Sequence, residues 1–265
     1  MRPRVTFVQI TDSHLGPTRD YSYYGHSPYR TLARAIDLIN AMPQPPDFVV
    51  HTGDLSNDRS VESYELAAEL LGRLRVPLYL VNGNHDDRAL LRKILDAPYA
   101  PDGDPDAPLD YVFEVKGERF LVLDGWSPEV RDPLGKLSAA QLARARAEAE
   151  SDGPPLTMLL HYPPFPMGSP WLDQHMPLVN GEALHEALLP ARHRLRGVFC
   201  GHLHRSSQIV RGGITYFCGP STVAGYAWRP WENTPALDPD YPPAYSVVHY
   251  FDGQVVVHQY TFPRG

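Results

Sequence analysis

The chain has 265 residues, 43% of them hydrophobic, and a formal net charge of -7 at pH 7. This length and composition predict one packed domain over residues 1–265. The negative charge argues against a long nucleic acid as partner, because binding many phosphates needs a basic surface. Cys200 and Cys218 are too few for a disulfide framework, and no apolar stretch is long enough for a signal sequence or a membrane span. We therefore expect a cytoplasmic protein without a membrane partner.

In the first part of the chain, apolar strands alternate with amphipathic helices. The predicted segments are a strand over 5–10, a helix that Ser27 caps and Pro28 opens, a strand over 48–51, a helix over 66–74 and a strand over 78–81. This alternation is typical of parallel strands joined by helical crossovers. An α/β fold is the expected class.

The second part of the chain begins with a hairpin, which indicates a second, more antiparallel sheet. The predicted segments are a hairpin over 111–115 and 119–123, a helix over 138–152, strands over 156–160 and 198–200, a helix over 183–189, and strands over 214–218, 246–250 and 254–260. The loop over 165–179 is unusually long for a βα connection, which favours a functional role. The Pro- and Trp-rich insert over 227–243 is predicted to be a cap over the site or a dimer surface, because exposed aromatic clusters usually have a partner.

Polar residues stand at the ends of the apolar strands. In α/β folds the carboxyl ends of strands carry the ligands, and seven oxygen- or nitrogen-bearing residues follow strands here: Asp12, His14, Asp54, Asn84, His161, His202 and His204. Together they offer enough donors for two metal ions. Because none is a cysteine, the set suits Mn, Fe, Zn or Ni better than a structural zinc knot. His85, which follows Asn84, titrates near neutrality and is a candidate for acid catalysis.

In this order, Asp-x-His, Gly-Asp, Gly-Asn-His-Asp, a lone His and Gly-His-x-His resemble the motifs of the calcineurin-like metallophosphoesterases, with the match spanning residues 12–204. Within that superfamily the chain looks most like the bacterial class III cyclic-nucleotide phosphodiesterases and the related glycerophosphodiesterases. The resemblance implies a four-layer α/β/β/α sandwich in which two mixed β-sheets are flanked by helices.

The resemblance also implies the roles of individual residues. Two divalent or mixed-valence ions are expected, one bound by Asp12, His14 and His204, the other by Asn84, His161 and His202, with Asp54 bridging both. His85 would then be the outer-sphere catalytic histidine that contacts the phosphate. Either Asp86 or Asp87 is expected to orient its ring.

The expected activity is hydrolysis of a small phosphodiester, a 3',5'-cyclic nucleotide such as cyclic AMP or a glycerophosphodiester, by attack of a metal-bound hydroxide. Two ions close together can hold both the nucleophile and the phosphoryl oxygens. A phosphomonoesterase or a nuclease on the same fold is the alternative. A non-catalytic protein-binding scaffold is the third hypothesis, and the complete set of candidate ligands counts against it.

Two loops are expected to contact the substrate. Tyr23 and His26 lie one loop after Asp12, and Trp171 and His175 lie in the long loop after His161. Aromatic and imidazole groups in these places could contact a base or an alcohol arm of the diester. A homodimer or a higher homo-oligomer is the expected assembly if the insert over 227–243 is a dimer surface rather than a cap.

Overall fold

Two β-sheets form the interior of the protein. The computed structural model describes residues 2–98, 100–231, 233–234 and 236–264. In the first sheet the strand order is β13-β12-β1-β2-β3, with β1 (Val5–Ile10), β2 (Phe48–His51), β3 (Leu78–Leu80), β12 (Ala244–Phe251) and β13 (Gln254–Thr261). β1, β2 and β3 are parallel, whereas β12 is antiparallel to both β1 and β13. Strands from both ends of the chain therefore share one sheet.

The second sheet has the strand order β4-β5-β6-β7-β9-β8. Its members are β4 (Tyr111–Val115), β5 (Glu118–Val122), β6 (Leu156–Leu159), β7 (Leu195–Cys200), β8 (Ser207–Arg211) and β9 (Ile214–Cys218). The prediction of a more antiparallel second sheet is wrong, because β5, β6, β7 and β9 run parallel to one another. Only β4 and β8, at its two edges, are antiparallel to their neighbours.

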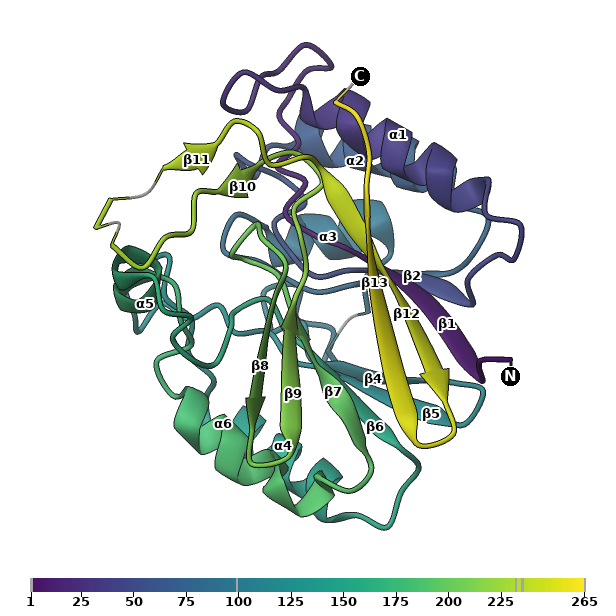
Figure 1. Ribbon diagram of the computed structural model, residues 1–265, viewed down its shortest axis with the longest axis vertical. Helices are drawn as coiled ribbons and strands as arrows, with labels where there is room; N and C mark the ends of the chain where they lie inside the picture. The colour runs from purple at the N-terminus through teal and green to yellow at the C-terminus, as the bar shows by residue number, and fades with distance from the viewer. Residues whose placement is uncertain (1, 99, 232, 235, 265) are drawn as a thin grey trace.

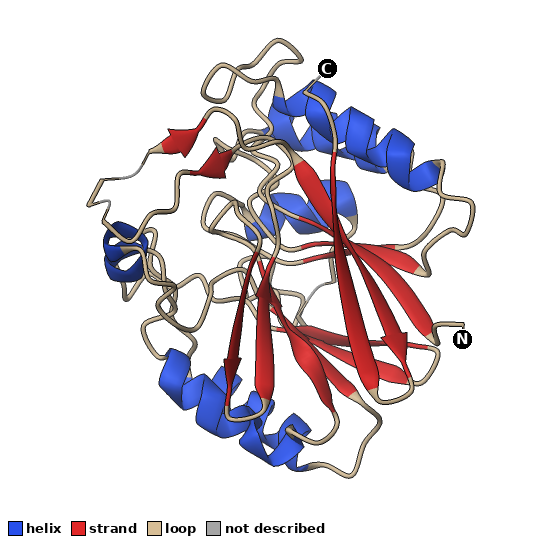
Figure 2. Ribbon diagram, viewed as in Figure 1, coloured by secondary structure: helices blue, strands red, loops and turns tan. Residues whose placement is uncertain are grey.

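Helices cover the outer faces of both sheets (Figure 2). α1 (Pro28–Asn40), α2 (Val61–Leu71) and α3 (Arg88–Leu95) pack against the first sheet, and α4 (Ala139–Glu150) and α6 (Gly181–Leu188) against the second. Between the sheets lies a third apolar layer, in which Phe7 stacks on Phe48 at 5.0 Å and meets Phe199 of the other sheet edge-on at 5.4 Å. The expected four-layer α/β/β/α sandwich is confirmed.

The helix ends follow the local sequence. Ser27 accepts a hydrogen bond from the backbone of Arg30, and Ser138 forms the predicted capping box with Gln141. α3 is missing from the prediction, although Asp87 caps it by accepting from the backbone of Leu90. The sequence prediction also lacks β8, the short helix α5 (Pro170–His175) inside the loop 165–179, and the 3₁₀ turn Leu189–Ala191.

Two short strands that pair antiparallel belong to the region of the predicted insert over 227–243: β10 (Gly225–Tyr226) directly precedes it and β11 (Leu237–Asp238) lies inside it. Its residues 232 and 235 lie outside the described residues. Figure 1 shows β10 and β11 beyond both sheets, on the side of the molecule that carries α5. The loops after β1, β2, β3, β6 and β7 end on this same side, so that residues from both sheets meet there.

Candidate metal centre

Most of the predicted metal ligands have an uncommon backbone conformation. A positive φ is found at Asp12 (51°), His14 (46°), Asp54 (57°), His202 (73°) and His204 (55°). In residues other than glycine this left-handed conformation costs of order 1–3 kcal/mol each and persists only where the surroundings impose it. The strand ends thus turn sharply at the residues whose side chains converge.

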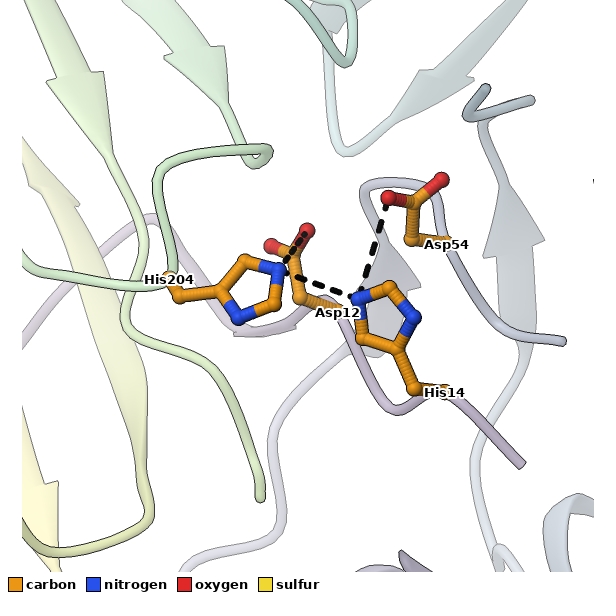
Figure 3. A group of neighbouring side chains, drawn as sticks. All are labelled: Asp12, His14, Asp54 and His204. Atoms are coloured by element: carbon orange, nitrogen blue, oxygen red, sulfur yellow. Dashed lines mark hydrogen bonds and ion pairs between the residues drawn. The ribbon is translucent and has the colours of Figure 1, made fainter. Parts of the chain in front are cut away.

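The first group of converging donors is formed by Asp12, His14, Asp54 and His204, whose donor atoms all lie within 4.8 Å of one another. The Nε2 atoms of His14 and His204 are 3.0 Å apart, and His204 Nε2 lies 3.4 Å from Asp12 Oδ1. His14 Nε2 lies 3.8 Å from Asp54 Oδ2. Figure 3 shows these four side chains pointing at one common place.

The second group shares Asp54 with the first and adds His161 and His202. His161 Nε2 lies 3.3 Å from Asp54 Oδ2 and 2.9 Å from His202 Nδ1. The amide oxygen of Asn84 also points here, at 3.3 Å from His161 Nε2. The structure therefore brings all seven predicted ligands together in two groups, with Asp54 common to both.

In three of the histidine rings, the nitrogen that points away from the other donors contacts a backbone carbonyl. This contact leaves the inward nitrogen, which faces the other donors, suited to bind a cation. His161 Nδ1 donates to the carbonyl of Thr52 (2.8 Å), His202 Nε2 to that of Pro133 (3.0 Å) and His204 Nδ1 to that of Ala224 (3.1 Å). A carbonyl only accepts, so each outward nitrogen carries the proton and the inward nitrogen of the neutral ring carries a lone pair. The lone pairs of His161 and His202 then face each other at 2.9 Å, which is stable only with a positive charge between or beside them.

The pKa values show the same demand for positive charge. Burial raises the pKa of Asp12 to about 7, and Asp54 adds to this shift. Burial opposes protonation of His161, but the charge and hydrogen bond of Asp54, with Asp12, raise its pKa to about 9. Without a metal, a proton on His161 fills the place between the ligands. The residues present therefore fit divalent cations, which can replace that proton.

Backbone groups fix both carboxylates. Asp12 accepts hydrogen bonds from the backbone N–H of His202, at 3.1 and 3.0 Å, and Asp54 accepts one from the backbone N–H of His85 at 2.9 Å. Gly83 allows this approach, because a Cβ there would stand 2.2 Å from Asp54 Oδ1. These backbone hydrogen bonds orient each carboxylate toward the other donors.

The ring of His85 lies beside the first group, with its centroid 4.9 Å from that of His14. Its Nδ1 donates to the backbone carbonyl of Asn57 at 3.0 Å, which leaves Nε2 free. The prediction that Asp86 or Asp87 orients this ring is wrong. Asp86 instead accepts from the backbone N–H groups of Leu55, Ser56 and Gly83, and Asp87 caps α3.

A hollow of about 130 Å³ opens over the donors, and His14, Asp54, Asn84, His85, His202 and His204 line it. Three aromatic rings form its wall: Tyr23, which stacks on His14 at 4.5 Å, Trp171, and Tyr226. His26 and His175 are not among the residues that line it; His175 stacks on Trp171 at 4.9 Å. Sequence reasoning missed Tyr226, which belongs to the two-residue strand β10 and has no motif around it.

Comparisons with known proteins agree with this geometry. The family model for the calcineurin-like phosphoesterases matches residues 5–206. The 3',5'-cyclic adenosine monophosphate phosphodiesterase CpdA of Escherichia coli (strain K12) is 31% identical over 84% of this chain and 78% of its own length. The glycerophosphodiester phosphodiesterase GpdQ of Enterobacter lignolyticus is 30% identical over 82% of this chain and 77% of its own.

Among solved structures, a dimetal phosphatase from Danio rerio superimposes with a TM-score of 0.72 over 99% of this chain and 100% of its own. At 17% sequence identity this likeness concerns the fold alone. No helix in the described ranges is both long and apolar enough to cross a lipid bilayer.

Proposed function

The chain belongs to the calcineurin-like phosphoesterase family, a family of metal-dependent hydrolases, and from this premise we propose that it hydrolyses a small phosphodiester. The observation that carries the proposal is the single carboxylate of Asp54 shared by two groups of buried donors at the floor of a small hollow. Relatives named as a cyclic AMP phosphodiesterase and a glycerophosphodiester phosphodiesterase support the diester.

The chain's own residues would hold two cations. Asp12, His14 and His204 face one position, Asn84, His161 and His202 face the other, and Asp54 lies between them. When bound, divalent ions would supply Lewis acidity and lower the pKa of water to about 7. The imidazole and oxygen donors suit Mn, Fe, Zn or Ni.

His85 is the residue we assign to proton transfer. Its Nδ1 is held by the carbonyl of Asn57, so the only nitrogen that can give a proton to a leaving oxygen is Nε2. The partly exposed ring lines the hollow beside His14 without belonging to either donor group. That position lets the imidazolium protonate the alcohol as it leaves.

The size and charge of the site favour a diester. A hollow of about 130 Å³ is smaller than the roughly 300 Å³ at which pockets for drug-sized ligands begin, so it accommodates a phosphoryl group while an ester arm extends along the aromatic wall. Two bound dications would, with the two carboxylates and a hydroxide, give the site a formal charge of about +1, which the single negative charge of a diester would neutralise. The cytoplasmic location and the oligomeric state stay predictions.

The test is a substrate panel with the purified, metal-loaded enzyme. We expect kcat/KM for bis(p-nitrophenyl) phosphate to exceed that for p-nitrophenyl phosphate, and both activities to disappear with a chelator. A clear preference for the monoester would refute the diesterase proposal. Activity on the aryl diester with none on 3',5'-cyclic AMP would remove only the nucleotide assignment, and a glycerophosphodiester would then be tried.

A further inference from the structure

Tyr226 occupies a place in the wall that connects the metal ligands with the insert. Its ring centroid lies 4.9 Å from that of His204 and 6.4 Å from that of Trp171. It lines the hollow together with Tyr23. The two tyrosines and Trp171 come from three distant segments and together form the aromatic part of the wall.

Among the described residues, the hydroxyl of Tyr226 has no hydrogen-bond acceptor. Within the part of the chain that the structure describes, neither the Tyr226 nor the Tyr23 hydroxyl makes a hydrogen bond. The rings of the two tyrosines are nevertheless in contact with the rings of His204 and His14. Burial raises the pKa of Tyr226 above its usual value, and the proximity of Tyr24, Asp12 and Asp54 adds to the shift. The phenol thus remains protonated, and its O–H is available as a hydrogen-bond donor at the wall of the hollow.

Arg205 holds this tyrosine in place. It directly follows His204, and its Nη1 donates to the backbone carbonyl of Tyr226 at 2.8 Å and to Asp238 Oδ2 on β11 at 3.3 Å. Its guanidinium also lies 4.5 Å from the ring centroid of Tyr241. Tyr241 in turn packs so closely on Gly225 that a Cβ at Gly225 would stand 2.1 Å from the ring.

We propose that Tyr226 contacts the substrate, its hydroxyl donating to an oxygen of the diester phosphate and its ring flanking the ester arm, and that Arg205 is the positioning residue that keeps it beside His204. This inference rests on the proposed diesterase function. It makes the β10 strand, and not only the loops after β1 and β6, part of the substrate site.

The first variant to measure is Tyr226→Phe, which removes only the hydroxyl. A hydrogen bond to a charged partner predicts a roughly tenfold to hundredfold rise in KM for bis(p-nitrophenyl) phosphate. kcat should change little, because the diester is charged in both the ground state and the transition state. The inhibition constant of inorganic phosphate should rise by a similar factor. Tyr260→Phe, at an exposed tyrosine on β13, is the matched control and should behave as the wild type.

The second pair of variants addresses Arg205. Arg205→Gln should raise KM and the inhibition constant of phosphate in the same direction as Tyr226→Phe, by a smaller factor, and Arg205→Lys should recover part of the loss. Arg211→Gln, which breaks a surface ion pair with Glu182, is the control. Metal content per chain should equal that of the wild type in every variant.

Two results would overturn the inference. One is a Tyr226→Phe enzyme with wild-type KM and wild-type inhibition by phosphate. The other is an Arg205→Gln enzyme whose metal content falls, since Arg205 would then support His204 rather than Tyr226. A wild type that prefers the monoester refutes the diesterase proposal alone, because inhibition by phosphate still reports on the tyrosine.

Discussion

The floor and the wall of the hollow are built differently. The floor consists of buried donors that follow strands of both sheets, and backbone groups hold them, as with the N–H of His202 on Asp12. The wall consists of Tyr23 in a loop, Trp171 in α5 and Tyr226 in a two-residue strand. Tyr23 stacks on His14 and the ring of Tyr226 lies beside that of His204, whereas the ring contact of Trp171 in the wall is with Tyr226. The difference teaches that the two sheets place the candidate metal ligands, while peripheral segments supply the aromatic side chains above them.

The largest effect is expected for Asp54→Asn, in the floor. Loss of the shared carboxylate should weaken both cation sites together. It should lower kcat/KM by about three orders of magnitude, because bound metal ions stabilise the transition state by several kcal/mol. His14→Ala should chiefly empty one site. Metal content per chain after dialysis distinguishes the two variants. An Asp54→Asn enzyme that retained two ions and full activity would refute the shared assignment.

His85→Ala, at the border between floor and wall, should retain its metals and lose about 10² to 10⁴ in kcat if the ring acts as general acid. The loss should be larger for an alkyl ester than for a nitrophenyl ester, since a leaving group of low pKa needs less protonation. Measuring both substrates is the check. Equal losses would assign His85 to phosphate positioning.

The pH dependence of the floor comes next in size. The pKa of His161 in the fold, about 9, exceeds its ordinary 6.5. Protonation of His161 therefore stabilises the metal-free fold fully below pH 6.5, and this stabilisation is lost as pH rises through 9. The Tm of the metal-free protein should fall between pH 7 and pH 9, where the buried rings of His51 and His204, with pKa values of about 3 and 4, stay neutral.

Metal affinity should rise over the same range. Binding displaces the His161 proton, so the affinity measured by chelator competition should increase by up to about tenfold per pH unit between pH 7 and pH 9. The metal-loaded protein should show a nearly constant Tm there. A metal-free Tm that did not change between pH 7 and pH 9 would contradict the assignment of the proton to His161.

The smallest effects are expected at Trp171 and His175. Trp171→Ala should raise KM for an aryl diester by about tenfold at most, because stacking between aromatic rings is worth roughly 0.5–1.5 kcal/mol. His175→Ala should do less, since His175 reaches the hollow only through Trp171. Metal content should be normal in both. If His175→Ala were the more damaging, the substrate arm would follow α5 instead of the wall.

The sequence predicts the floor because the floor residues follow strands, which the periodic apolar pattern reveals. Apolar runs predict strands, parallel strands place their carboxyl ends together, and Asp12, Asp54 and His161 stand at those ends. Sequence cannot show that the carbonyl of Asn57, 28 residues before His85, orients the ring of His85, because every residue has a carbonyl. The sequence does not predict the place of Tyr226 for a related reason. A two-residue strand has no periodicity, and the backbone of Tyr226 is held by Arg205, an arginine twenty-one residues earlier.

The residues of the floor are synthesised far apart in time, because they are far apart in the sequence. His14 and His204 are 190 residues apart, and the two groups of donors take residues from both sheets. A nascent chain that ends before β7 lacks both His202 and His204. The first group of donors then contains a single histidine, His14, and the second also contains one, His161. We therefore expect a complete cation site to form only after β7 and the residues that follow it have been synthesised.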